Sequence, residues 1–344
     1  MEKSAQEVVL TVSSSPHVRC NESIPKIMWT VVATLVPAAA FGVYYFGFNA
    51  LLNIIVSIVS AVFFEWAWEK FMRKKIMIND GSAVITGLLL AMCCSPILPW
   101  WMCIVGSFIA IVVCKQAMGG LGYNLFNPAH VGRAGLMVSW PVAMTTWTQV
   151  NGSVIDGVAG ATPLNVLKQS GYDALLQLFN NDPMTMYQNM FLGFRNGSMG
   201  ETSTVLLILG GLFLMYKGYV KWQATVAMIA TVGILMWIFG GAVGAHATGG
   251  LFTGDPIFHM MAGGLIIGAF FMSTDMVTAP ITLKGQLIFA VGAGVLTVLI
   301  RLLGGYPEGV CYSILLMNAV TPLIDLTVKP RIFGSVKVKA KEAE

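Results

Sequence analysis

Ile27-Met-Trp-Thr-Val-Val-Ala-Thr-Leu-Val-Pro-Ala-Ala-Ala-Phe-Gly-Val-Tyr-Tyr-Phe-Gly-Phe48 contains no charged residue over about 22 positions. As a helix it spans the roughly 30 Å of a bilayer's hydrocarbon core, and it is longer than the apolar part of a signal peptide. We therefore expect a retained membrane helix. Further apolar runs cover 50–72, 82–95, 98–114, 126–142, 204–219, 222–243, 255–272, 285–303 and 309–328. The expected fold is an all-α polytopic membrane protein with about ten transmembrane segments, in two groups of five.

Composition supports this class. Hydrophobic residues make up 56% of the 344 residues and charged residues 10%, so the lipid bilayer is the main surrounding of the chain. The net charge of +4 comes without a basic, aromatic-rich patch, which excludes a nucleic-acid partner. Six cysteines form no C-x-x-C pair, and the four histidines lack ligand spacing. We expect buried free thiols at Cys93, Cys94, Cys103 and Cys114, and no metal site.

The distribution of Lys and Arg predicts the orientation. The basic residues beside the apolar runs are Lys3, Arg19, Lys26, Lys70, Arg73, Lys74, Lys75, Lys115, Lys217, Lys221, Lys284, Lys329, Arg331, Lys337, Lys339 and Lys341. If ten spans alternate, all of these fall on one side, which is then the cytoplasmic side. The expected division is a cytoplasmic segment 1–25, a first five-helix block 26–142, an outer loop 143–203, a second block 204–328 and a basic cytoplasmic tail 329–344.

The two blocks echo each other faintly. Gly87-Leu-Leu-Leu before Cys94-Ser-Pro96 resembles Gly264-Leu-Ile-Ile before Ser273-Thr-Asp275, at an offset of roughly 180 residues. Because each block has an odd number of spans, the two repeats would be inverted in the bilayer. The break at Ser95-Pro96 and the Gly/Pro-rich beginning of the fifth segment favour broken or half helices, which in such folds line sites near the midplane.

Several polar residues interrupt this apolar background. Asp156-Gly-Val-Ala-Gly-Ala-Thr-Pro-Leu164 lies in the long loop, where small residues leave the backbone bare before Thr162 and Pro163 biases that threonine towards an extended conformation. Such an arrangement holds a hydroxyl out where a modifying enzyme can reach it. The alternative is an ordinary turn.

Gly119-Gly-Leu-Gly-Tyr-Asn-Leu-Phe-Asn-Pro-Ala-His-Val-Gly-Arg133 lacks the preceding strand and the spacing of a dinucleotide loop. Arg133 is costly within a span unless it is paired or solvated, which indicates function; the alternative is an arginine that snorkels or pairs with a carboxylate of another subunit. Glu65 and Asp275 are candidates for an ion path. The alternatives are an interfacial acid for Glu65, whose i, i+4 neighbour is Glu69, and a helix-end cap for Asp275.

These stretches resemble one family. DGVAGATPL is similar to the flavinylation site of the NqrB/RnfD family, GGLGYNLFNPA to its GGxGxNxFNPA segment, and FMSTD to its FMATD-type motif. The resemblance covers nearly the whole chain. It implies FMN esterified to Thr162, with Gly160 and Ala161 shaping the acceptor site, and it allows a second, non-covalent flavin such as riboflavin. Asn124 and Asn127 would hydrogen-bond a flavin ring, and Arg133 would face the phosphate.

The short N-terminal region is more like the RnfD branch than the NqrB branch. The resemblance then implies a membrane electron-transfer subunit of an Rnf complex, an ion-translocating ferredoxin:NAD⁺ oxidoreductase of the bacterial inner membrane that moves Na⁺ or H⁺. Such a subunit is enzymatic only within the complex. Its partners would be the other Rnf subunits (C, B, A, G and E), and a flavin transferase would mature it. Thr162 would lie on the outer face, in agreement with the charge-based orientation.

Two other functions fit parts of the sequence. An inverted five-helix repeat with broken helices is also the plan of small-solute channels such as urea transporters. A scaffold without redox turnover is a third possibility. A plain channel has no use for a flavinylation-like loop, and a scaffold predicts that Thr162→Ala leaves electron transfer intact.

Overall fold

The computed structural model describes residues 22–147, 161–243 and 249–330, and in these ranges all regular structure is helical. The first block consists of α1 (Ile24–Phe46), α2 (Phe48–Phe71), η1 (Ile78–Asp80), α3 (Ser82–Met92), α4 (Trp100–Phe108), η2 (Ile109–Gln116) and α5 (Pro128–Ser139). The connecting region holds α6 (Pro141–Thr145), α7 (Pro163–Gln177), α8 (Pro183–Leu192) and η3 (Met199–Glu201). The second block consists of α9 (Thr204–Tyr216), α10 (Trp222–Phe239), α11 (Pro256–Met261), α12 (Leu265–Ile267), η4 (Gly268–Met272), α13 (Leu283–Leu303) and α14 (Val310–Thr327).

Five helices of the described chain are long and apolar enough to cross a membrane: α1, α2, α10, α13 and α14. Three shorter apolar helices accompany them, namely α3, α9 and the continuous Trp100–Gln116, in which α4 passes into the π-helical η2. The remaining two expected segments are α5 and the interrupted α11–α12–η4. The expectation of a helical polytopic membrane protein is confirmed, whereas only five of the expected runs form uninterrupted helices of spanning length.

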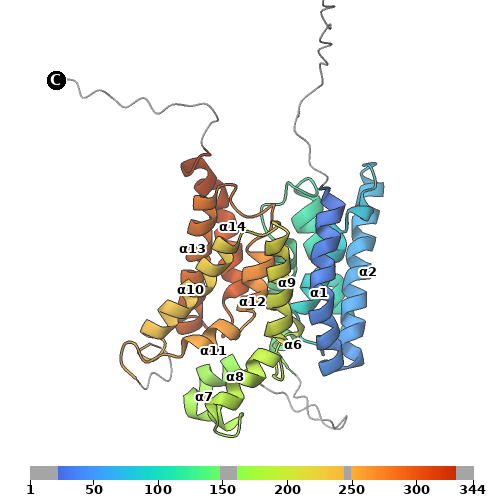
Figure 1. The fold of residues 1–344 in the computed structure, drawn as a ribbon. Helices are drawn as coiled ribbons and strands as arrows, with labels where there is room; N and C mark the ends of the chain where they lie inside the picture. Colours follow the sequence, from blue (N-terminus) through green and yellow to red (C-terminus); the bar gives the residue numbers. More distant parts are fainter. Residues whose placement is uncertain (1–21, 148–160, 244–248, 331–344) are drawn as a thin grey trace, which may run out of the picture.

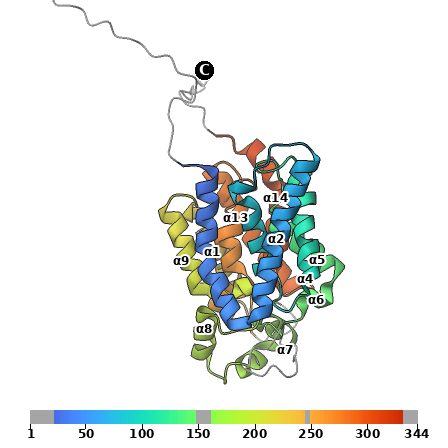
Figure 2. The same cartoon turned by 90° about the vertical axis from the view of Figure 1, so that its right-hand side faces the viewer.

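The two blocks stand side by side, with α1 and α2 on one flank, α10 and α13 on the other, and α9 next to α1 (Figure 1). Helix α1 begins and α14 ends at the same end of the bundle, here called the terminal end, and the views in Figures 1 and 2 place α7 and α8 at the opposite end, the α7–α8 end. Tryptophans mark both levels. Trp29, Trp66, Trp68 and Trp222 belong to the terminal ends of their helices, and Trp100, Trp101, Trp140 and Trp237 to the opposite ends. Such belts are typical of membrane interfaces.

The third segment is a half-helix. Helix α3 has 11 residues, which is about 16 Å of helix and roughly half the hydrocarbon thickness. The buried chain that follows is stabilised by Asn53 of α2, whose Nδ2 donates to the carbonyls of Pro96 at 3.1 Å and Leu98 at 2.9 Å. The predicted break at Ser95-Pro96 is confirmed, because a side chain supplies donors where the helix no longer can.

The eighth segment is also broken, which the unbroken run 255–272 did not predict. Gly263 and Gly264 adopt positive φ values of 69° and 65° between α11 and α12. The guanidinium of Arg301 on α13 donates to the carbonyls of His259 at 2.6 Å and Ala262 at 2.7 Å. Glycine permits the turn, and the arginine satisfies the carbonyls that α11 leaves unpaired.

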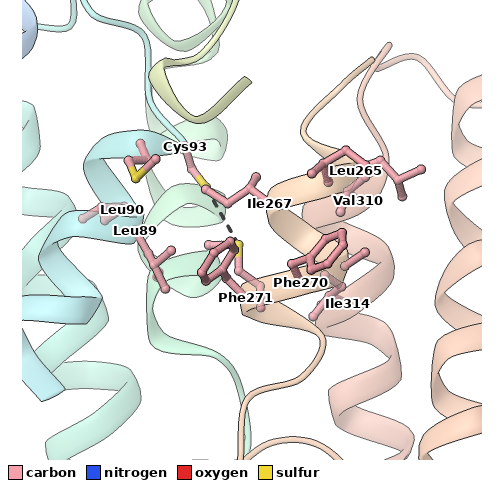
Figure 3. Close-up of a cluster of buried hydrophobic side chains, with 14 of the residues drawn as sticks. Leu89, Leu90, Cys93, Leu265, Ile267, Phe270, Phe271, Val310 and Ile314 are labelled. Atoms are coloured by element: carbon pink, nitrogen blue, oxygen red, sulfur yellow. Dashed lines mark hydrogen bonds between the residues drawn. The ribbon is translucent and has the colours of Figure 1, made fainter. Parts of the chain in front are cut away.

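The two broken segments meet in the centre of the molecule. Figure 3 shows Leu89, Leu90 and Cys93 of the third segment facing Ile267 and Phe271 of the eighth. The Sγ atom of Cys93 lies 4.0 Å from the Sδ atom of Met272, and the described cysteines are buried and free, as expected.

On the other side of η4, Phe270 packs towards Val310 and Ile314 of α14 (Figure 3). A Cβ at Gly211 of α9 would come within 1.9 Å of the Phe270 ring, so only glycine allows α9 to approach η4 this closely.

Most of the described residues of the expected outer loop, 143–147 and 161–203, are helical. Helices α7 and α8 share their own apolar cluster with α11, separate from the main core. Its buried members are Leu164, Leu175, Phe179, Met186, Met190, Phe258 and Ala262. The sequence did not predict these helices, because the few apolar residues that build this cluster are spread over a polar sequence, which hides their helical spacing.

Candidate functional site

A cavity at the terminal end brings together several of the expected site residues. Its polar wall is formed by Ser82, Lys115, Asn124, Asn127 and Asp275. Apolar side chains of α1, α3, α9 and η4 form the rest, among them Met28, Leu89, Leu214 and Phe271. We call this space the terminal-end cavity. A mostly apolar cavity with a few polar groups in its wall is typical of sites for small molecules and cofactors.

The two asparagines have different roles. Asn127 is the N-cap of α5, because its Oδ1 accepts hydrogen bonds from the backbone N–H groups of Ala129 at 3.1 Å and His130 at 3.4 Å. Asn124 donates from Nδ2 to the carbonyl of Phe126 at 3.1 Å, and its buried Oδ1 has no protein partner. A buried acceptor on a cavity wall is open to a ligand donor.

Asp275 is held by its own turn. Its Oδ1 accepts from the N–H of Val277 at 3.4 Å and its Oδ2 from the hydroxyl of Thr278 at 3.2 Å. Asp275 also lines a second, more polar cavity of about 280 Å³, together with Lys221 and Gln286. The carboxylate is therefore both a local cap and a wall shared by two cavities.

Glu65 is buried in α2 and paired. Its Oε1 accepts from Nζ of Lys115 at 2.6 Å and from Nε2 of Gln116 at 2.9 Å, while Lys115 also donates to the hydroxyl of Ser82 at 2.6 Å. Glu65 therefore lies inside the protein in an ion pair. Lys115, which the sequence analysis counted among the charges at segment ends, is buried in this pair and 1% exposed.

At the other end, Thr162 is the N-cap of α7. Its φ of −66° and ψ of 149° are the extended values expected before Pro163, and its Oγ1 accepts from the N–H of Asn165 at 3.2 Å. The side chain is 2% exposed, so the expectation of an outward-held hydroxyl is wrong for this conformation. Ala161 is half-buried, and Gly160 lies outside the described residues.

Arg133 of α5 pairs within the chain. It forms a salt bridge with Glu308, from the connection between α13 and α14, and its Nε donates to the carbonyl of Cys93 at 3.0 Å. The expected alternative of a carboxylate on another subunit is therefore wrong. The arginine joins the two blocks and caps the broken end of α3.

Arg133 and Glu308 also line a cavity of about 300 Å³, which we call the α7–α8-end cavity. Asn165 and Gln169 of α7 form one side of it, two and six residues beyond Pro163. Its aromatic lining consists of Trp147, Tyr306 and Tyr312, and the two tyrosine rings stack with centroids 5.9 Å apart. The first turn of α7 therefore opens onto an aromatic space with one ion pair in its wall.

Two further buried charges near this end have no counterpart in the sequence-based expectations. Arg195 donates from Nε and Nη2 to the carbonyl of Glu201, at 3.0 and 2.6 Å. The carboxylate of Glu201 accepts from the hydroxyl of Ser198 at 2.9 Å, and burial together with the nearby Glu308 raises the pKa of Glu201 to about 7. Arg301 was also missed, although an arginine inside a predominantly apolar segment is a sequence signal that could have singled it out.

The fold and these sites define a class: a polytopic helical membrane protein whose two helical blocks are joined by a buried ion pair between Arg133 and Glu308, with cavities towards both ends. Comparison with known proteins then identifies the family. A sequence model of the NQR2, RnfD, RnfE family matches residues 11–334. The chain belongs to this family.

Relatives match along nearly their whole length. The chain is 63% identical over 327 residues to the D subunit of the proton-translocating ferredoxin:NAD(+) oxidoreductase complex of Clostridium ljungdahlii, and the match covers 95% of this chain and 97% of that protein. It is 43% identical over 340 residues to the D subunit of the Na(+)-translocating ferredoxin:NAD(+) oxidoreductase complex of Acetobacterium woodii, covering 98% and 99%. The D subunit of the ion-translocating oxidoreductase complex of Stutzerimonas stutzeri is 38% identical over 338 residues, covering 91% and 93%.

Proposed function

We propose that this protein is the D subunit of an ion-translocating ferredoxin:NAD⁺ oxidoreductase, and that it carries FMN esterified to Thr162. The names of its relatives support the complex. The observation that carries the flavin is the position of Thr162, a threonine N-cap whose helix borders an aromatic cavity. The other subunits of the complex and a flavin transferase are the proposed partners.

The residues around Thr162 fit this cofactor. A phosphate ester on the N-cap oxygen would lie at the positive end of α7, where a dianion is favoured by the helix dipole and by free N–H groups. The α7–α8-end cavity offers Trp147, Tyr306 and Tyr312 for contact with a flat ring, although it does not enclose a complete flavin. Arg133 is neutralised by Glu308, so its proposed part is to shape the wall of this cavity, and the helix supplies the phosphate contacts.

We also propose that a second, non-covalent flavin binds at the terminal-end cavity, whose volume of about 100 Å³ encloses only part of such a molecule. The free Oδ1 of Asn124 is an acceptor for a ring N–H, and Asn127 keeps the beginning of α5 in place beside it. Bound flavin would accept and release electrons one at a time, and the protein would hold each ring at a fixed distance from its neighbours and keep water away from it.

We further propose that the blocks 26–142 and 204–328 are inverted repeats, with 1–25, 143–203 and 329–344 as the flanking and connecting segments. The contacts between helices that would correspond support this proposal: α1 packs on α9, and α5 packs on α14. Within each block the second helix packs on the fourth, as α2 on α4 and α10 on α13. This matching of partners is expected when one packing plan occurs twice in opposite orientation.

In the proposed orientation the terminal end faces the cytoplasm of a bacterial inner membrane. Lys74, Lys217 and Lys284 support it, since they are exposed at that end of their helices. Thr162 and α7–α8 then lie on the outer side. Glu65 and Asp275 remain the proposed ion-path residues, both at the cytoplasmic level, and Asp275 is the better placed of the two because it borders two cavities.

The test is in-gel flavin fluorescence of the denatured protein after co-expression with a flavin transferase. The wild-type band should fluoresce, Thr162→Ala should lose all signal, and Thr162→Ser should retain part of it because the hydroxyl remains. A dark wild-type band would contradict the proposal and favour the channel or transporter. If the wild-type band fluoresces but electron transfer from ferredoxin to NAD⁺ is unchanged in Thr162→Ala, the result would favour a scaffold.

A further inference from the structure

Thr162 is buried, yet an enzyme that attaches FMN must reach its hydroxyl. The inference drawn from this conflict rests on the proposed attachment of FMN to Thr162. The side chain is 2% exposed, and its Oγ1 accepts the hydrogen bond that begins α7. A transferase must place the hydroxyl within bonding distance of a phosphorus atom in its own active site. The folded conformation does not offer the hydroxyl in that way.

Lys168 and the apolar side chains of Leu164 and Leu167 attach the first two turns of α7 to the second block. Lys168 donates from Nζ to the carbonyls of Gly304 and, at 3.0 Å, Tyr306, just beyond the end of α13. Leu164 is buried beside the glycine turn of the eighth segment, since a Cβ added at Gly263 would lie 2.9 Å from its Cδ2. Burial lowers the pKa of Lys168, as expected for an ammonium group partly withdrawn from water.

A break separates these two turns from the rest of the helix. Gly171 has a φ of 87° and a ψ of −179°, which are not helical values. Beyond it, Leu175 and Phe179 are held with Met186 of α8 in the separate apolar cluster. Residues 163–170 thus lie on one side of this glycine, where Leu164 and the partly buried Leu167 pack against the same apolar cluster, and the rest of the α7–α8 unit lies on the other side.

We propose that residues 161–170 undock from the α13–α14 connection to receive the flavin, and that redocking covers the finished ester. In the undocked state Thr162 Oγ1 attacks the flavin-side phosphorus of a flavin pyrophosphate such as FAD. A P–O bond forms to Oγ1, the bond to the bridging pyrophosphate oxygen breaks, AMP leaves, and the hydroxyl proton passes to a base of the transferase. No electrons are exchanged. Redocking then protects the ester from water and from further enzyme action.

Undocking can be measured without any transferase. In the full chain, in a Cys20→Ser background, Thr162→Cys is treated with a maleimide in detergent. The remaining described cysteines are buried. We expect labelling at least about tenfold slower than in denaturant, and about tenfold faster when Lys168→Met is added, since two charge-assisted hydrogen bonds are lost. Lys284→Met, which removes an exposed lysine at the terminal end, should leave the rate unchanged.

Flavin transfer supplies the second test. Unmodified chain is incubated with FAD and purified transferase, and the initial growth of the fluorescent band is followed. Lys168→Met should be modified several-fold faster than wild type and Lys284→Met at the wild-type rate. The undocking step would be overturned if Thr162→Cys were labelled as fast in the native protein as in denaturant. It would also be overturned if Lys168→Met changed neither the labelling rate nor the transfer rate. Failure of every variant to accept flavin would instead overturn the proposed function, with the labelling rates still deciding whether the segment undocks.

Discussion

The two ends of the molecule use buried polar groups in different ways. At the terminal end, charges pair among side chains, as Glu65 does with Lys115, and one acceptor of Asn124 remains free on a cavity wall. At the α7–α8 end, the arginines bind mainly main-chain carbonyls where helices break: Arg133 at Cys93, Arg301 at His259 and Ala262. The first end thus leaves an acceptor free on a cavity wall, whereas the second uses its arginines to hold irregular backbone.

The largest loss of stability is expected when the ion pair between Glu65 and Lys115 is broken. Lys115→Met leaves Glu65 buried without its cation, which typically costs about 3–5 kcal/mol. In heating experiments in detergent, the variant should lose its monodisperse peak far below the wild-type temperature. Adding Glu65→Gln should recover a large part of the loss, because the uncompensated charge is gone. If Lys115→Met behaved like the exposed control Lys284→Met, the pair would have no structural role.

The next largest loss of stability is expected when a side chain that binds backbone carbonyls is removed. Asn53→Leu removes both donors from the carbonyls of Pro96 and Leu98, and a buried carbonyl without a partner costs about 1–3 kcal/mol. The same heating assay should show a clear loss. Ser60→Ala, on the same helix, loses only bonds to its own helix backbone and should stay near wild type. Equal behaviour of the two variants would mean that the break after α3 needs no side-chain donors.

Thermal stability should depend on pH through a group near the α7–α8 end. Burial raises the pKa of Glu201 to about 7, so the folded state binds its proton more tightly than the unfolded state does. The contribution of Glu201 to stability is therefore full below the ordinary carboxyl pKa near 4.5 and falls as pH rises towards about 7. Thermal stability measured from pH 5 to 8 should decline in wild type and decline less in Glu201→Gln. An identical slope in both would assign the dependence to other groups.

The smallest effect concerns the ligand cavity. Asn124→Leu removes the free acceptor and should weaken non-covalent flavin by about tenfold, the worth of one hydrogen bond in a buried site. Flavin released by denaturation and separated from protein-bound flavin measures this directly. The Thr162-linked signal should not change, because that site lies at the other end. If Asn124→Leu lost both the non-covalent flavin and the Thr162-linked flavin, the two ends would not hold separate flavin sites.

The sequence revealed what depends on local pattern. Hydropathy predicted α1, α2, α10, α13 and α14, and Ser95-Pro96 predicted the break after α3, because length and helix breakers are local properties. It also identified Arg133 as costly in a span.

The partners of the buried charges could not be found in this way. Glu308 lies 175 residues from Arg133, and Lys115 lies 50 residues from Glu65, so each pairing is set by tertiary packing. The α7–α8 unit was missed for a related reason, since its small apolar cluster is completed by Phe258 and Ala262 of α11.

The central claim is that one hydroxyl, at the end of the bundle opposite the beginning of α1, carries a flavin nucleotide. Mass spectrometry of the proteolytic peptide spanning residues 156–168, taken from protein isolated from its native membrane, tests this most directly. The account predicts a peptide heavier by FMN less one water, with the added mass localised to Thr162. An unmodified peptide, or the same mass on another residue, would contradict it.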